Sequence, residues 1–202
     1  MTFPDLSAFV LTGGKSSRMG TDKAFLKIGS QTLLELALGL AEAAAEEVRI
    51  VGPRETFGRY ATTVEDTFRN CGPLGGIHAA LKSSKTELNL LLSVDTPFIS
   101  TGFLSYLISQ VATDAEVTVP RVGGRWQPLC AVYRRSFGDI AEVALRAGQY
   151  KIDALFSKVA VLALDETAWQ PLGFSPLMFQ NLNTPEEYQA ARAWKDPSIG
   201  EP

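Results

Sequence analysis

The sequence predicts a three-layer α/β domain built around a mainly parallel sheet. Short, continuous apolar runs alternate along the chain with longer segments of helical character, an order typical of a parallel sheet covered by helices on both faces. The polar residues that stand out by type fall just after the apolar runs, where the strands would end. Ligands of such sheets bind at the carboxyl ends of the strands, so we expect the functional site there.

The strands are predicted from apolar runs that are too short for most helices. The run at 7–12 breaks at Gly13-Gly14, and the run at 88–94 ends at Asp95. A turn is expected at 52–53, and the polar segment 121–125 is expected to loop over the sheet edge between two strands. The predicted strands are 7–12, 48–51, 88–94, 117–120, 130–133 and 159–164.

The helices are predicted from their apolar stripes and their end signals. Thr32 and Glu35 have the spacing of a capping box. Thr184 stands at the cap of the last helix, with Pro185 at its first position and Glu187 at its third. The other predicted helices are 33–47, 101–112, 136–147 and a short one from residue 77, after a glycine-rich loop at 72–76.

Composition limits the possible classes of function. The chain has 202 residues, of which 46% are hydrophobic and 20% charged, enough for a buried core. A net charge of -3 gives no overall basic surface for nucleic acid, and no apolar run suits a membrane span or secretory signal. Cys71 and Cys130 lie far apart, without metal-ligand spacing. We expect one cytoplasmic domain over 1–195 and a frayed tail at 196–202.

A glycine-rich segment follows directly on the first predicted strand. Gly13-Gly14 lets the backbone turn sharply and present N–H groups to phosphate oxygens. Arg18 and Lys23 add a planar guanidinium and an ammonium point charge, both suited to phosphate. The spacing is neither GxxxxGK[ST] nor GxGxxG. The alternative is a strand-to-helix turn with solvated cations, but glycines, serines and cations together after a buried strand favour a phosphate site.

The same segment, LTGGKSSRMGTDK at 11–23, resembles the signature LxGGxSxRMGxDK of the nucleotidyltransferases that activate molybdopterin, specifically their guanylyltransferase branch. The resemblance implies a Rossmann-like nucleotidyltransferase fold, GTP and molybdopterin as substrates, and Mg²⁺ as cofactor. It also implies a guanine dinucleotide cofactor and pyrophosphate as products, with other cofactor-synthesis proteins and acceptor apo-enzymes as partners. The resemblance extends through the motifs at 72–77, 94–98, 127–129 and 181–187.

The resemblance also implies the catalytic residues. Asp95 lies where the family has its metal-binding aspartate, and a hard carboxylate oxygen suits Mg²⁺; taken alone, this residue could equally start the turn before Pro97. Lys23 and Arg18 are implied to stabilise the charge that develops on the phosphates. A phosphate acceptor is already ionised at neutral pH, so we expect neither a general base nor a covalent intermediate. The implied nucleotide-binding residues are Leu11, Thr12, Gly13, Gly14, Lys23, Asp66 and Asp95.

Asp66 is implied to contact the base of the nucleotide. A carboxylate accepts from the N1–H and N2–H₂ edge of guanine and would select guanine over adenine. The alternative is a solvated loop acid. Some family members place an asparagine after the second strand, whereas this chain has Val-Gly-Pro-Arg at 51–54, so that contact is missing or falls to the backbone.

On the acceptor side, the resemblance implies Gln127, Asn181 and Asn183. The two asparagines are expected at the end of a late strand, and an amide that both donates and accepts suits a pterin edge. Their alternative is a turn-and-cap role before Pro185. His78, the single histidine, is expected to pack rather than to react.

Two rival classes of function stay open. One is a cytidylyltransferase acting on the same cofactor, or another small-molecule nucleotidyltransferase such as one for sugar or alditol phosphates. By resemblance, the second glycine after the first strand, the Asp22-Lys23 pair and the asparagines of 181–183 favour the guanylyl branch. The other rival is a non-catalytic GTP-binding module, against which the intact Asp95, Lys23 and Arg18 argue.

Overall fold

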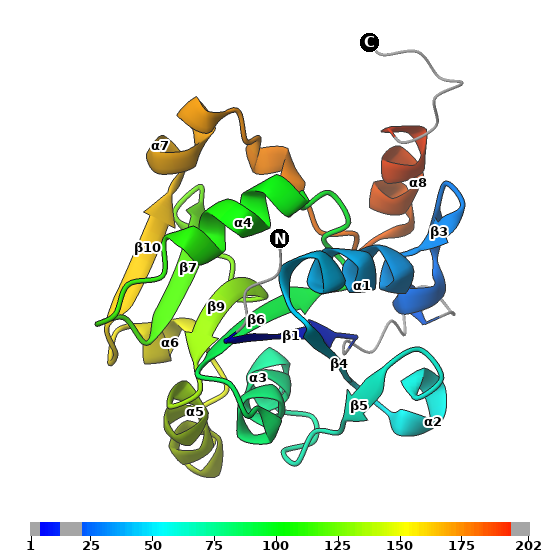
Figure 1. The fold of residues 1–202 in the computed structure, drawn as a ribbon. Helices are drawn as coiled ribbons and strands as arrows, with labels where there is room; N and C mark the ends of the chain where they lie inside the picture. Colours follow the sequence, from blue (N-terminus) through cyan, green and yellow to red (C-terminus); the bar gives the residue numbers. More distant parts are fainter. Residues whose placement is uncertain (1–4, 13–21, 195–202) are drawn as a thin grey trace.

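The computed structural model describes residues 5–12 and 22–194. The strands of its main sheet are β1 (Leu6–Leu11), β4 (Glu47–Val51), β5 (Thr62–Val64), β6 (Leu88–Ser93), β7 (Val117–Val122), β8 (Arg125–Trp126), β9 (Cys130–Arg134) and β10 (Val161–Asp165). Their order is β10-β7-β9-β6-β1-β4-β5 (Figure 1), and β8 pairs with β7. A separate hairpin joins β2 (Lys27–Ile28) to β3 (Gln31–Thr32).

Most strands of the main sheet are parallel, as predicted. β1 pairs in parallel with β4 and β6, β5 with β4, and β10 with β7, whereas β9 and β8 run antiparallel to their neighbours. Every residue of β1 is buried, as expected for a strand covered on both faces. Leu11 stands opposite both Val51 and Ser93, so the carboxyl ends of three parallel strands are level.

Helices cover both faces of the sheet and complete the three predicted layers. The helices are α1 (Leu33–Ala44), α2 (Arg54–Phe57), α3 (Pro73–Ser83), α4 (Thr101–Ser109), α5 (Phe137–Arg146), α6 (Asp153–Phe156), α7 (Glu166–Trp169) and α8 (Pro185–Trp194), with 3₁₀ turns η1 (Lys23–Phe25), η2 (Gln170–Leu172) and η3 (Pro176–Phe179). α1 and α4 lie on one face, α3 and α5 on the other (Figure 1). Because side chains alternate along β1, Val10 packs in the α1 and α4 core and Phe9 in the α3 and α5 core.

The predicted capping boxes of α1 and α8 are confirmed. Thr32 Oγ1 accepts from the Glu35 N–H (3.1 Å), and the Glu35 carboxylate accepts from the Thr32 N–H (2.7 Å). The same reciprocal pair joins Thr184 and Glu187, at 3.2 Å and 2.9 Å. Both helices therefore begin where the sequence predicts, with two of their terminal N–H groups satisfied.

The predicted loop at 121–125 is wrong. Arg121 and Val122 continue β7, and the chain turns back at Gly123-Gly124 into β8. Both glycines have positive φ, 53° and 74°, which side chains disfavour. The segment is therefore a hairpin, and β7 and β9 are antiparallel neighbours inside the sheet.

The predicted loop at 72–76 is also wrong, because α3 begins at Pro73. Its glycines serve close packing. A Cβ at Gly75 would stand 2.7 Å from the Phe68 carbonyl oxygen, and one at Gly76 would stand 3.0 Å from Leu11 Cδ2. The helix can therefore approach both the segment after β5 and the end of β1 only where it lacks side chains.

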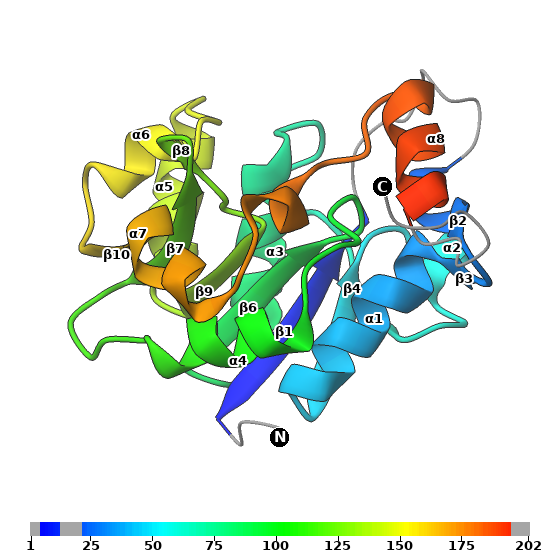
Figure 2. The same ribbon diagram turned by 90° about the horizontal axis from the view of Figure 1, so that it is seen from above.

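Asn181 and Asn183 were expected at the end of a late strand, but neither of them follows a strand. β10 ends at Asp165 and is followed by α7, η2 and η3. The asparagines lie in the irregular segment after η3, which runs across to α8 (Figure 2). Leu182 anchors this segment, since its N–H donates to the Asp95 carbonyl (3.0 Å) and its side chain is fully buried.

Some expectations fall beyond what the structure describes. The tail at 196–202 lies outside the described residues, and the single domain over 1–195 stays a prediction. Within residues 5–12 and 22–194, no helix is long and apolar enough to cross a membrane.

Candidate active site

Three predicted site residues meet at the carboxyl edge of the sheet. Asp95 follows β6, whose end is joined to β1 because the Val94 N–H donates to the Leu11 carbonyl (3.2 Å). Lys23 begins η1, and its Nζ lies 3.3 Å from Asp95 Oδ2. Asn183 comes from the far end of the chain, and its Oδ1 accepts from the same ammonium at 2.9 Å. Carboxylate, ammonium and amide therefore form one contact network.

Neighbouring residues fix the orientation of this network. Asp22 Oδ1 accepts from the Ala24 N–H (3.0 Å) and caps η1, so that Lys23 starts from a defined turn. On the other side, Ser93 Oγ donates to Asp95 Oδ1 (2.6 Å). The Lys23 and Asp95 side chains are only 16% and 23% exposed, so water screens their attraction less than that of a surface ion pair.

The N-terminal motif carries three more of the predicted site residues. Gly13, Gly14 and Arg18 lie outside the described residues. Of the motif at 11–23, the structure describes Leu11, Thr12, Asp22 and Lys23. The roles assigned to Gly13, Gly14 and Arg18 stay predictions.

Thr12 joins two strand ends. Its N–H and its Oγ1 both donate to the Val51 carbonyl, at 3.2 Å and 2.9 Å, and the residue is 7% exposed. Gly52, which follows β4, leaves room for this contact, because a Cβ there would stand 2.3 Å from Thr12 Oγ1 and 3.0 Å from Phe57 Cδ2. The structure thus gives a packing reason for glycine at 52, within the segment 51–54 where the expected asparagine is missing.

We expect Gly52→Ala to destabilise the protein by about 1–3 kcal/mol, as overpacking does. Thr12→Ala in the same chain should restore part of this loss, because it removes the nearest clash. Urea unfolding of both single variants and the double variant measures the coupling. Gly39→Ala in α1, where a Cβ meets nothing within 4 Å, is the control and should not destabilise. If the changes in unfolding free energy of Thr12→Ala and Gly52→Ala simply add in the double variant, a clash between a Cβ at position 52 and the Thr12 hydroxyl is ruled out.

Asp66 lies between β5 and the start of α3. Its Oδ1 is buried and receives no hydrogen bond from the described residues. Burial raises the pKa of this carboxyl, and the nearby His78 partly offsets the rise. Gly75 lets the carboxylate come close, since Asp66 Oδ2 lies 3.7 Å from the position of a Cβ there. A buried acceptor without a partner is costly, so this oxygen is suited to a donor supplied by a ligand.

His78 packs within α3, as expected, and stands apart from the Lys23 network. It is 4% exposed, and Phe68 contacts its ring edge-on, with centroids 5.0 Å apart. Its Nε2 lies 3.7 Å from Glu142 Oε2, and burial lowers the pKa of the imidazole. The ring thus packs against the segment that carries Asp66.

The acceptor-side residues are only partly brought together. Asn183 contacts Lys23, but Asn181 is exposed on the same segment. Gln127 precedes β9, and the adjacent Leu129 carbonyl accepts from the Ser93 N–H (3.0 Å). Gln127 therefore lies at the same sheet edge as Asp95, but it does not join the Lys23 network.

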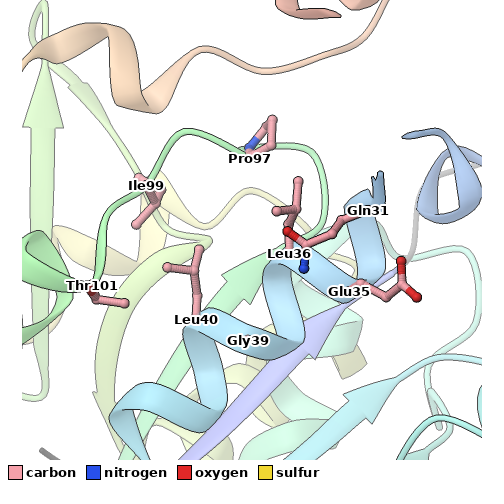
Figure 3. A pocket seen from close by; sticks show the side chains of 8 residues that line it. All are labelled: Gln31, Glu35, Leu36, Gly39, Leu40, Pro97, Ile99 and Thr101. Carbon is pink, nitrogen blue, oxygen red and sulfur yellow. The ribbon is translucent and has the colours of Figure 1, made fainter. Parts of the chain in front are cut away.

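A pocket of about 200 Å³ lies between α1 and the segment that links β6 to α4 (Figure 3). Glu35, its one ionisable lining residue, is already held in the capping box of α1. The pocket therefore offers no free charge for chemistry. Its lining residues are Gln31, Glu35, Leu36, Gly39, Leu40, Pro97, Ile99 and Thr101.

Comparison with known proteins assigns the family. The sequence model of the MobA-like NTP transferase domain matches residues 8–158, well over half of the chain. The chain belongs to the MobA-like NTP transferase family. Within this family it is 34% identical to the "Probable molybdenum cofactor guanylyltransferase" of Pelotomaculum thermopropionicum, over 94% of this chain and 93% of the relative. It is 30% identical to the "Molybdenum cofactor guanylyltransferase" of Desulfosudis oleivorans, over 93% and 95%.

The fold of this MobA-like transferase also matches a solved structure. The molybdopterin-guanine dinucleotide biosynthesis protein A from Archaeoglobus fulgidus superposes with a TM-score of 0.80 at 24% identity, over 92% of this chain and 96% of that one. The expected nucleotidyltransferase fold is therefore confirmed. Lys23 and Asp95 fall within the matched family domain, whereas Asn181 and Asn183 lie beyond its last residue.

Two residues of the site were missed by the sequence analysis. Ser93, which donates to Asp95, is a polar residue at the end of the strand LNLLLS, and this position was a usable signal. Glu187 accepts from the Asn183 N–H (2.6 Å) as well as capping α8. The sequence predicted the cap, but the contact beyond the helix depends on the path of the chain after η3.

Proposed function

We propose that the chain transfers GMP from GTP to molybdopterin, forming a guanine dinucleotide cofactor and releasing pyrophosphate. The contact among Lys23, Asp95 and Asn183 carries this proposal, because it brings three separate family motifs to one sheet edge. Two relatives that match over more than nine-tenths of the chain bear the name of this activity. An edge that joins an ammonium, a carboxylate and an amide suits a polyphosphate on one side and a polar acceptor on the other.

In this proposal, catalysis consists of positioning and charge neutralisation. A terminal phosphate oxygen of molybdopterin forms a bond to the α-phosphorus of GTP, and the bond from that phosphorus to the pyrophosphate oxygen breaks. The attacking oxygen is already ionised, so no side chain has to remove a proton. Lys23 neutralises charge on the nucleotide phosphates, and the backbone at the end of β1 lines their site. Arg18 is proposed to add a second cation.

We infer that Asp95 holds a magnesium ion together with the phosphates. Within the described residues, no group of three His, Cys, Asp or Glu side chains could hold a metal alone. A single carboxylate completed by substrate oxygens and water is a usual magnesium environment, so the residues fit the ion. When bound, Mg²⁺ would neutralise charge that develops on the transferred and leaving phosphates.

For the base, we propose that Asp66 accepts from the N1–H and N2–H₂ groups of guanine. Its buried Oδ1, which has no partner among the described residues, supports this assignment over a solvated loop acid. Adenine and cytosine each present an amino group but no adjacent ring N–H, so one carboxylate oxygen would stay without a donor and penalise those bases. This requirement favours GTP over the rival CTP.

We expect Asp66→Asn to reduce the preference for GTP over ATP by roughly 10- to 100-fold, the loss of one hydrogen bond to a charged group. The phosphate contacts lie elsewhere, so the triphosphate should still bind. Steady-state kcat/KM with both nucleotides measures the ratio. An unchanged ratio in a folded variant would exclude Asp66 from base selection.

The same variant should be more heat-stable than the parent at neutral pH. Burial raises the pKa of Asp66 above its ordinary value of 3.8, so the charged form opposes folding above the raised pKa. Asparagine removes that penalty. The gain, about 2–4 °C if it amounts to 1 kcal/mol, should vanish as the pH falls through the raised pKa towards 3.8, where the parent carboxyl is protonated. Thermal melts at pH 4 and pH 7 without nucleotide test this.

On the acceptor side, we propose that Gln127, Asn181 and Asn183 contact molybdopterin. All three are carboxamides near the edge that carries Asp95, and such groups can both donate and accept. We place the reaction in the cytoplasm, where the two separate thiols, Cys71 and Cys130, would stay reduced. Proteins that deliver molybdopterin and apo-enzymes that receive the product are the proposed partners.

A pyrophosphate-release assay tests the proposed function. The purified chain, GTP and molybdopterin should release one pyrophosphate per acceptor, and EDTA should stop the release. Omission of molybdopterin should also stop it. GTP binding without pyrophosphate release at any magnesium concentration would favour a non-catalytic GTP-binding module.

A further inference from the structure

The segment 181–188, which we call the C-terminal strap, is tied to the nucleotide side of the site at three points. The Leu182 N–H donates to the Asp95 carbonyl (3.0 Å), and Asn183 Oδ1 accepts from Lys23 Nζ (2.9 Å). The Tyr188 hydroxyl accepts from the Lys27 N–H (3.2 Å) and donates to the Lys27 carbonyl (2.7 Å). These bonds join residues that lie about 90–160 positions apart, as the sequence numbers show.

Glu187 holds the middle of the strap. Its Oε2 accepts from two successive backbone donors, the Asn183 N–H (2.6 Å) and the Thr184 N–H (2.9 Å). The second bond belongs to the capping box of α8. The first reaches past the helix cap and fixes the backbone of Asn183, whose side chain meets Lys23.

This first bond is not needed to start α8. The box that joins Thr184 and Glu187 is complete without it, since each side chain already accepts a backbone N–H of the other. Charge-assisted hydrogen bonds of this kind are stronger than neutral ones. The extra bond therefore acts on the orientation of Asn183.

We propose that Glu187 is a positioning residue for Lys23. By fixing Asn183, it holds the amide oxygen where the ammonium meets it, with Asp95 on the other side of that ammonium. Lys23 is thereby kept at the boundary between the proposed phosphate and acceptor sites. This inference rests on the proposed function for its catalytic meaning, but the contact itself can be tested without substrate.

The test compares three variants. Glu187→Ala removes both bonds, Glu187→Gln keeps an acceptor oxygen, and Glu186→Ala is the matched control. Glu186 is the exposed neighbour in the same first turn of α8, so its removal changes the helix charge equally. Thermal melts show whether each variant is folded.

The substrate-free readout is the reactivity of the Lys23 amine. A low dose of acetic anhydride labels lysines according to their accessibility, and peptide mass spectrometry measures each site. Lys85, exposed shortly before the start of β6 and so away from its carboxyl end, serves as the internal reference. In Glu187→Ala, the ratio of Lys23 to Lys85 labelling should rise roughly 3- to 10-fold, as for loss of one hydrogen bond. In Glu187→Gln, this labelling ratio should lie close to that of the parent, and in Glu186→Ala it should equal that of the parent.

Kinetics supply the second readout. If Glu187 acts through Asn183, Glu187→Ala should lower kcat. In a chain that already carries Asn183→Ala, the same substitution should lower kcat little further. Unchanged Lys23 labelling in a folded Glu187→Ala variant would overturn the inference, as would multiplicative losses in the double variant. If the parent chain transfers no GMP but labelling follows the expected order, the proposed function fails and the positioning contact stands.

Discussion

Asp95→Ala is expected to lower kcat for GMP transfer by about two to four orders of magnitude, because it removes the proposed metal ligand from the reacting phosphates. The residue stands after β6, outside the buried strand, and its bond to the strap uses the backbone carbonyl. The fold should therefore survive the substitution. Single-turnover transfer from labelled GTP measures the chemical step directly.

Asp95→Asn separates charge from shape. The amide retains an oxygen that can accept from Ser93, as the carboxylate does at 2.6 Å, but it carries no charge for a cation. We expect it to be nearly as inactive as Asp95→Ala at ordinary magnesium. Near-normal turnover of either folded variant would remove Asp95 from the mechanism.

Lys23→Ala is expected to weaken GTP binding about 10- to 100-fold, the loss of one charge-assisted contact, and to slow transfer as well. Lys23→Arg should restore only part of both. The ammonium fits as a compact donor between Asp95 and Asn183, at 3.3 Å and 2.9 Å, whereas a guanidinium is larger and planar. Calorimetry and steady-state kinetics measure the two effects separately.

Lys27→Ala is the matched control for the lysine. Lys27 is exposed in β2, and only its backbone bonds Tyr188, so truncation of its side chain keeps the strap in place. GTP affinity should then change little at moderate salt. Equal losses for Lys23→Ala and Lys27→Ala would point to general surface charge instead of a specific site.

The strands and helices that were predictable carry a local signal. The apolar run of β1 identifies a buried strand without any knowledge of its neighbours, and Thr32 with Glu35 identifies the start of α1. The reversal of β9 has only an indirect signal, because the connection between residues 120 and 130 is short for a parallel crossover. The start of α3 was missed because Gly75 and Gly76 are poor helix formers. Glycine is needed at these positions because Phe68 and Leu11 approach the helix closely.

The residues of the candidate site also divide into those with a local signal in the sequence and those without one. Asp95 and Lys23 could be chosen from the sequence because each follows a strand or a glycine-rich motif, and parallel strands bring such positions to one edge. The contact of Asn183 with Lys23 could not be predicted, because it depends on the path through α7, η2 and η3. Thr12 stays a predicted nucleotide-binding residue, and the bond from its hydroxyl to the Val51 carbonyl had no signal in the sequence.

The nucleotide specificity of transfer is the most direct test of the proposed function. Equimolar GTP, CTP, ATP and UTP should be offered together with molybdopterin and magnesium, and the products separated by mass. We expect the guanine dinucleotide to dominate, because the unpaired carboxylate oxygen of Asp66 favours the donor edge of guanine. A cytosine dinucleotide formed in equal amount would contradict the guanylyl assignment, and the absence of every dinucleotide would contradict transfer itself.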